Sequence, residues 1–247
     1  MVGKIISIVQ ARCNSKRLSN KVLRLISGKP LIHHIFERIS FCSHDMKNIL
    51  ATTISKKDDA LIKWAKKNSI KFFRGSENDV LTRFFETAKF FKADIIVRIT
   101  ADDPFKEPGL IDKALNILIQ KKLDFVSNNN PPSFPEGLDT EVFTFKALSR
   151  ANLLAKEKFE REHVTQFFYK NPKQFKQLNF RCKKSLHHLR WTIDTSADLK
   201  MVRLIYKNLY KKENLFLMKD ILELLDSNPS INKINNNVKR SYMYKTS

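Results

Sequence analysis

The chain has 247 residues, of which 42% are hydrophobic, and carries a formal net charge of +21. This length suits one large α/β domain, and the hydrophobic share suffices for a substantial core. No run approaches the ~18 apolar residues of a transmembrane helix, KIISIVQ is too short for a signal peptide, and three widely spaced cysteines fit neither a disulfide framework nor a zinc site. We therefore expect a cytoplasmic protein without membrane insertion.

The first half of the chain alternates short apolar strands with amphipathic helices. Ser76 is a plausible N-cap for the third of these helices. Such β-α alternation predicts a doubly wound, parallel sheet, whose ligands bind beyond the carboxyl ends of the strands. Strands are predicted over 4–10, 48–53, 70–73, 93–100 and 123–128, and helices over a segment opened by Pro30, 58–68, 79–91 and 107–122.

The second half has a turn-rich connection, 128–137, before its first strand. Ser196 is the expected cap of a long amphipathic helix. We place residues 1–230 in one domain and regard 231–247 as a polar tail or lid. Strands are predicted over 141–145, 174–180 and 186–194, and helices over 146–158, 159–169, 196–212 and 214–229.

The segment VQARCNSKRLSNKVL follows the first predicted strand and gathers four cations, Arg12, Lys16, Arg17 and Lys21. It contains no glycine, so neither a Walker A loop nor a dinucleotide-binding motif is present. A phosphate would therefore be held mainly by side chains, with Arg12 forming two parallel bonds and Lys21 placing a point charge. A solvated basic loop is the alternative.

Carboxylates follow two other predicted strands. Asp102 and Asp103 come after 93–100, and Asp194 ends 186–194. Mg²⁺ takes one or two protein carboxylates together with phosphate oxygens. These residues therefore favour a magnesium site across the edge of the sheet, although each could equally cap a turn or a helix.

Seven segments in the same order, spanning almost the whole chain, resemble motifs of the cytidylyltransferases that activate acidic sugars. These are the acylneuraminate and 3-deoxy-manno-octulosonate cytidylyltransferases, and the spore-coat polysaccharide branch is the most similar. VQARCNSKRLSNKVL resembles QARxxSxRLPxKVL, and VRITADDP resembles VRITGDCP. The other matching segments are FRGSENDVLTRF, FPEGLDTEVFTF, EREHVTQFFY, RWTIDTSADL and INNNVKRSY.

This resemblance implies a Rossmann-like, mostly parallel sheet of nucleotidyltransferase type, with a small β-containing dimerisation arm within about 134–190. It implies transfer of CMP from CTP to an acidic, ulosonic-type sugar, with pyrophosphate released, in surface polysaccharide or glycan biosynthesis. Mg²⁺ is the implied cofactor, and a homodimer is the implied assembly.

The resemblance also assigns roles to residues at matching positions. It makes Arg12, Lys21 and Asp102 catalytic, and it makes Asp102 and Asp194 the metal ligands. The implied sugar-binding residues are Glu136, Asp139, Glu141, Arg161 and His163, where His163 could instead serve helix packing. The implied nucleotide-binding residues are Gln10, Ala11, Arg12, Ser15, Arg17, Lys21, Arg74, Ser76, Asp79, Arg83 and Arg98.

The chain departs from these motifs at two places that bear on activity. Ser19–Asn20 replaces Pro-Gly, and Asn20 tolerates the left-handed backbone that the turn needs. Asp103 adds a carboxylate beside Asp102. Another NTP, a sugar-phosphate acceptor, or a catalytically weak binding partner of a glycan pathway therefore remain alternatives. Nucleic-acid binding has only the net charge in its favour, and we expect none.

Overall fold

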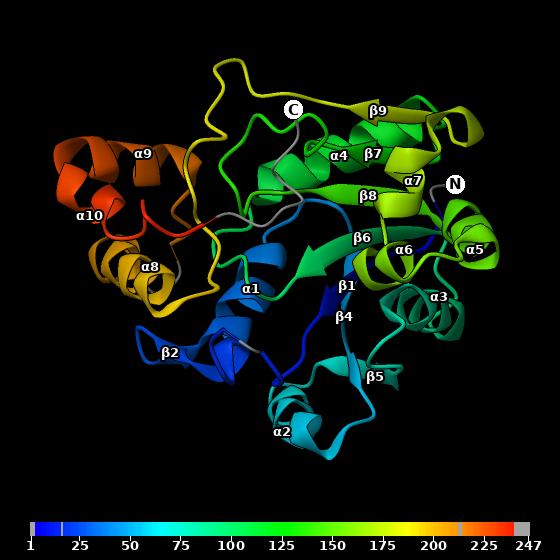
Figure 1. Ribbon diagram of the computed structural model, residues 1–247, viewed down its shortest axis with the longest axis horizontal. Coiled ribbons are helices and arrows are strands. Elements are labelled where there is room, and N and C mark those ends of the chain that lie inside the picture. Colours follow the sequence, from blue (N-terminus) through cyan, green and yellow to red (C-terminus); the bar gives the residue numbers. More distant parts are fainter. Residues whose placement is uncertain (1–2, 16, 212–213, 240–247) are drawn as a thin grey trace.

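The computed structural model describes residues 3–15, 17–211 and 214–239. Within them lies a seven-stranded sheet of order β5-β4-β1-β6-β8-β7-β9, flanked by helices on both faces (Figure 1). A separate two-stranded ribbon, β2 (Leu25–Ile26) with β3 (Lys29–Pro30), follows the opening loop. No helix in the described part of the chain is long and apolar enough to span a membrane. The strands of the main sheet are β1 (Ile5–Gln10), β4 (Met46–Thr53), β5 (Lys71–Gly75), β6 (Ile95–Thr100), β7 (Phe125–Ser127), β8 (Glu141–Thr144) and β9 (Gln177–Asn179).

The sheet is mostly parallel, as predicted, but one strand runs the other way. β8 lies between β6 and β7 and pairs antiparallel with both. The connection from β7 to β8 contains no crossover helix, so the chain turns back beside β7 instead of crossing the sheet. The five strands of the first half still share one direction, and their carboxyl ends meet at one edge.

The helices complete two hydrophobic layers, which confirms the doubly wound arrangement. Ile6 and Ile8 of β1 face the core under α3, α5 and α7, whereas Val9 faces the core under α1, α4, α8 and α9. Alternate residues of a strand point to opposite faces, so a buried apolar run supplies both layers. The helices are α1 (Leu31–Ile39), α2 (Asp59–Lys67), α3 (Val80–Phe90), α4 (Pro108–Gln120), α5 (Phe145–Leu154), α6 (Lys158–His163), α7 (Gln166–Lys170), α8 (Ser196–Leu209), α9 (Met218–Ser227) and α10 (Pro229–Lys233), and three single 3₁₀ turns are Lys21–Leu23, Lys56–Asp58 and Pro172–Gln174.

The predicted strand over 186–194 is wrong. Its backbone bonds to Glu136 and, through Ile193, to the carbonyl of Asp102, so it joins two loops and has no continuous strand partner. Within 134–190, β8 and β9 belong to the central sheet. The dimerisation role of this segment stays a prediction.

Both predicted helix caps are also wrong, by one to three residues. Asp79, not Ser76, caps α3, and Thr195, not Ser196, caps α8 in a reciprocal capping box with Asp198. The segment before each of these helices contains two or three neighbouring side chains that could cap it, and only the backbone geometry decides which one does. The left-handed turn expected at Asn20 is confirmed, with φ 52°.

The predicted polar tail begins as part of the fold. α10 packs against α8 and α9, and the Asn235 side chain is buried. Its amide nitrogen donates to the Arg190 carbonyl at 3.1 Å and to Asp198 Oδ1 at 2.9 Å. Residues 240–247, to which the rest of the tail prediction applies, lie outside the described residues.

Candidate active site

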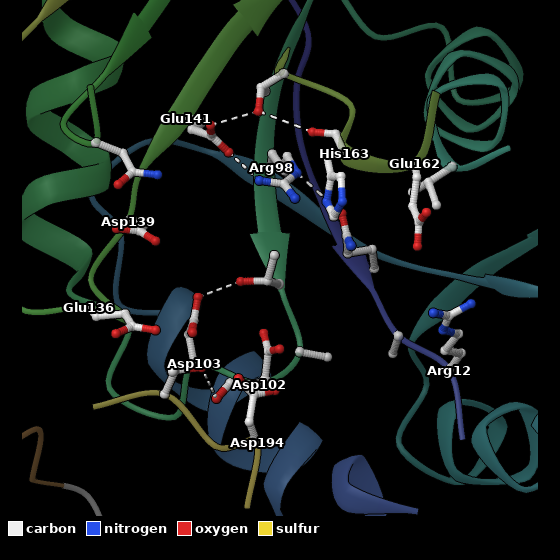
Figure 2. A pocket seen from close by; sticks show the side chains of 18 of the residues that line it. Arg12, Arg98, Asp102, Asp103, Glu136, Asp139, Glu141, Glu162, His163 and Asp194 are labelled. Atoms are coloured by element: carbon white, nitrogen blue, oxygen red, sulfur yellow. Dashed lines mark hydrogen bonds and ion pairs between the residues drawn. The ribbon is translucent and has the colours of Figure 1, made fainter. Parts of the chain in front are cut away.

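A cavity of about 480 Å³ opens at the edge where the carboxyl ends of β1 and β6 meet (Figure 2). The opening loop, the segment 100–103 and the connection after β7 all line it, which confirms that these polar segments converge. Fourteen of the predicted site residues line this cavity: Gln10, Ala11, Arg12, Ser15, Arg17, Lys21, Arg83, Arg98, Asp102, Glu136, Asp139, Glu141, His163 and Asp194.

The opening loop contributes a cationic wall. Arg12 lies on this side of the cavity, apart from Glu136 and Asp139 (Figure 2). Arg83 of α3 donates to the Ser76 carbonyl at 2.6 Å, and burial together with the charge of Arg12 lowers its pKa to about 10. A buried guanidinium beside a second cation forms a site that an anion would stabilise.

Lys21 joins the two aspartates that were predicted as metal ligands. Its Nζ lies 2.8 Å from Asp102 Oδ2, 2.9 Å from Asp194 Oδ1 and 2.9 Å from the Ile193 carbonyl oxygen. Burial would lower the pKa of this ammonium, but the two carboxylates outweigh burial and raise it. The loop after β6 and the segment before α8, which are far apart in sequence, therefore meet around one cation.

Arg190, which does not itself line the cavity, holds the carboxylate of Asp194 in position. Its guanidinium bonds to Asp194 Oδ2 at 3.0 Å, to Asp198 and to Glu136. Burial opposes ionisation of Asp198, but Arg190 and Asn235 outweigh it, and the pKa of this carboxyl is lowered. The network therefore ties the two ends of the cavity to the start of α8.

The far end of the cavity, which lies beside the start of β8 and away from the opening loop, is lined by paired charges. Arg98 forms an ion pair with Glu141, whose other oxygen accepts from the hydroxyls of Thr165 and Tyr169, both at 2.8 Å. Burial alone would raise the pKa of Glu141. Arg98 and the hydroxyl donors lower it by more, so this pKa lies below its ordinary value. The imidazole of His163 also faces this end, and burial lowers its pKa.

A second buried pair lies between these groups and the metal candidates. Lys106 bonds to Asp103 at 2.8 Å and to the Asp139 carbonyl at 2.6 Å. The carboxylate that distinguishes this chain from the resembling motif is therefore neutralised within the protein. Gly137 allows the neighbouring turn to approach closely, because its φ is 107° and an added Cβ would lie 3.0 Å from the Trp191 backbone.

Four predicted site residues do not line the cavity. Arg74 donates to the carbonyls of Thr53 and Ser55 and pairs with Asp59. These bonds hold the end of β4 against α2.

The other three serve α3 and its neighbour. Ser76 accepts from the backbone of Asp79, and Asp79 pairs with Arg161 at 2.7 Å, which ties α3 to α6. The hydrogen-bonding groups of these three residues hold the helices beside the cavity together, and their predicted binding roles stay predictions.

Two carboxylates from different loops suit a magnesium ion that completes its shell with water and phosphate oxygens. Asp102 and Asp194 share one cationic partner, so both carboxylates face the same point in the cavity. Across residues 3–15, 17–211 and 214–239, no group of three or more candidate ligands forms a metal cage made by the protein alone. Asp102 and Asp194 could hold Mg²⁺ in this cavity together with phosphate oxygens.

Sequence reasoning missed several residues at the cavity. Tyr169 and Thr165 lie within a segment that resembles a family motif, and Arg190 begins another, but the motifs did not reveal their partners. Lys106 had no sequence signal except its position three residues after Asp103. Their roles depend on contacts between distant segments.

The fold and the cavity define an α/β nucleotidyltransferase. The cytidylyltransferase family model matches residues 6–231, so the chain belongs to the cytidylyltransferase family and is an enzyme of the CTP-using nucleotidyltransferase class. An uncharacterised protein of Methanocaldococcus jannaschii is 42% identical over 96% of both chains. The spore coat polysaccharide biosynthesis protein SpsF of Bacillus subtilis is 30% identical over 92% of this chain and 96% of its own.

Solved structures show the same relationship. A cytidylyltransferase from Leptospira borgpetersenii superposes with a TM-score of 0.88 at 29% identity, over 96% of this chain and 99% of the other. A CMP:2-keto-3-deoxy-manno-octonic acid synthetase complexed with CTP shares the fold, with a TM-score of 0.66 at 18% identity over 84% of this chain and all of the other.

Proposed function

We propose that this enzyme transfers CMP from CTP to a hydroxyl of an acidic, ulosonic-type sugar and releases pyrophosphate. The observation that carries the proposal is the meeting of Lys21, Asp102 and Asp194 in one cavity with Arg12 and Arg83. The similarity to SpsF and the family resemblance support a role in surface polysaccharide biosynthesis. We further propose a cytoplasmic homodimer with Mg²⁺ as cofactor, on the same resemblance.

The reaction asks the protein mainly to position groups and neutralise charge, as in other phosphoryl transfers. The sugar oxygen attacks the α-phosphorus and its proton passes to water. The bond from the α-phosphorus to the oxygen that bridges the α- and β-phosphates breaks, and pyrophosphate leaves with the electron pair. Arg12, Arg83 and Lys21 would hold the triphosphate and neutralise the departing pyrophosphate. When bound by Asp102 and Asp194, Mg²⁺ would add positive charge at the phosphate oxygens.

The far end of the cavity favours a second candidate acceptor, a neutral sugar rich in hydroxyls. Four carboxylates line this end. Its two lining cations among the described residues, Arg98 and Lys106, pair with two of them, Glu141 and Asp103, and a third, Glu136, pairs with Arg190. Carboxylates accept hydrogen bonds from sugar hydroxyls, but they repel a second carboxylate. The four are Asp103, Glu136, Asp139 and Glu141, whereas Glu162 lies on the side of Arg12 (Figure 2).

Product analysis separates the two candidates. The enzyme, CTP and Mg²⁺ are incubated with ulosonic acids or with neutral hexoses and heptoses, and CMP-sugars are identified by mass spectrometry, with a control lacking acceptor. We expect a CMP-sugar and stoichiometric pyrophosphate from an acidic sugar. A product from neutral sugars alone would establish the second candidate, and no product from any acceptor would contradict the proposed transfer.

A further inference from the structure

The ammonium of Lys21 has a complete set of oxygen partners. Its three N–H donors meet three oxygens at 2.8–2.9 Å, one each from Asp102, Asp194 and the Ile193 carbonyl. The side chain is only 12% exposed. One lysine therefore neutralises part of the charge of both proposed metal ligands.

A divalent cation and this ammonium compete for the same oxygens. A metal bound by both carboxylates would lie between Asp102 Oδ2 and Asp194 Oδ1, which is where Nζ now lies. Mg²⁺–oxygen distances are about 2.0–2.1 Å, so the carboxylates would also have to draw inward. One position cannot hold both cations, and Coulomb repulsion opposes their close approach.

A bound triphosphate would provide a second binding position for the Lys21 ammonium. It lies at the start of a single 3₁₀ turn, Lys21–Leu23, and its unbranched side chain lines the same cavity as Arg12 and Arg83. A triphosphate held by those arginines would offer oxygens of higher charge than one carboxylate does. A flexible ammonium can exchange one set of oxygens for another, which a rigid guanidinium cannot do as readily.

We propose that Lys21 occupies the metal position in the nucleotide-free enzyme and moves onto the triphosphate when CTP binds, so that metal binding depends on the nucleotide. This proposal rests on the metal role proposed above for Asp102 and Asp194. Because coupling between two ligands is reciprocal, the metal also strengthens nucleotide binding. Asp194 Oδ2 keeps its ion pairs with Arg17 and Arg190 at either stage, so the exchange of ammonium for metal concerns only Asp102 Oδ2 and Asp194 Oδ1.

The test measures metal alone on nucleotide-free full-length protein. Mn²⁺, which favours the same carboxylate ligands, is titrated and its free concentration is followed by electron paramagnetic resonance. Lys21→Met removes the charge at nearly the same length, and Lys21→Gln, which keeps an N–H donor, provides a second uncharged variant should the first not fold. Lys21→Arg keeps the charge, and Lys121→Met controls for loss of one exposed lysine.

We expect either uncharged variant to bind one Mn²⁺ at least tenfold more tightly than wild type, Lys21→Arg or Lys121→Met. Adding Asp102→Asn to the uncharged variant should restore weak binding. Equal Mn²⁺ affinity in wild type and a folded uncharged variant would overturn the proposal. Such a result would leave the proposed transfer standing, because CMP-sugar formation by the wild-type enzyme is measured separately.

Discussion

Asp102→Asn is expected to lower turnover about 10²- to 10³-fold, the range seen when a preorganised charge-stabilising group is removed. The substitution keeps the size of the side chain and removes the negative charge that a metal requires. Lys21 keeps its bonds to Asp194 and to the Ile193 carbonyl, and Asp102 is 31% exposed, so the melting temperature should change by no more than a few degrees. Initial rates of pyrophosphate release measure the effect.

Asp45→Asn is the matched control, because Asp45 is exposed and its substitution removes the same charge. It should retain the wild-type rate. Near-normal turnover in Asp102→Asn would remove this residue from the catalytic machinery. Equal losses in both variants would show that the effect is one of net charge and not of the site.

Arg190→Met is expected to cause the largest loss of stability. Arg190 is 5% exposed and bonds to three carboxylates, so its removal leaves buried negative charges together without their common partner. Breaking a buried ion pair in this way costs about 3–5 kcal/mol. For a chain of this size the melting temperature should fall by roughly 10 °C. Thermal unfolding of the free protein measures it.

The stability lost in Arg190→Met should depend on pH, and the pKa of Asp198 determines the direction of this dependence. Its pKa is lowered in the folded protein, so the stabilisation is present above the ordinary aspartate pKa of 3.8 and is lost as the pH falls through the folded value. The difference in melting temperature between wild type and Arg190→Met should therefore narrow below about pH 4. Arg181→Met, which removes an exposed arginine, is the control. A loss no larger than that of the control would contradict the account of this network.

The strands and the nucleotide side of the cavity could be predicted because their signals are local. Five apolar runs separated by amphipathic helices define the parallel part of the sheet. Arg12 and Asp102 come just after the ends of β1 and β6, and Lys21 belongs to the same basic segment as Arg12. The direction of β8 could not be read from its own residues, since antiparallel insertion depends on the path of the loop before it. The segment 186–194 has strand composition, but its backbone partners lie in two separate loops.

Roles that depend on partners were the least predictable. Arg161 and Asp79 lie in matching motifs, yet they pair with each other and hold α3 to α6 instead of lining the cavity. Arg190 is the first residue of a matching motif, but no sequence pattern indicates its partners. In the structure it forms ion pairs with Glu136, Asp194 and Asp198. A charged side chain in a sequence shows what it can bind, whereas its actual partner is set by the packing of distant segments.

Thermal stability with each of CTP, ATP, GTP and UTP, with and without Mg²⁺, tests the central claim most directly, because it needs no acceptor sugar. A ligand present at a hundred times its Kd stabilises a protein by about 2.7 kcal/mol. For this chain that corresponds to a rise in melting temperature of roughly 5–10 °C. We predict this rise for CTP with Mg²⁺ and little change for the other nucleotides. No rise with any nucleotide would contradict the assignment of the cavity as a CTP site.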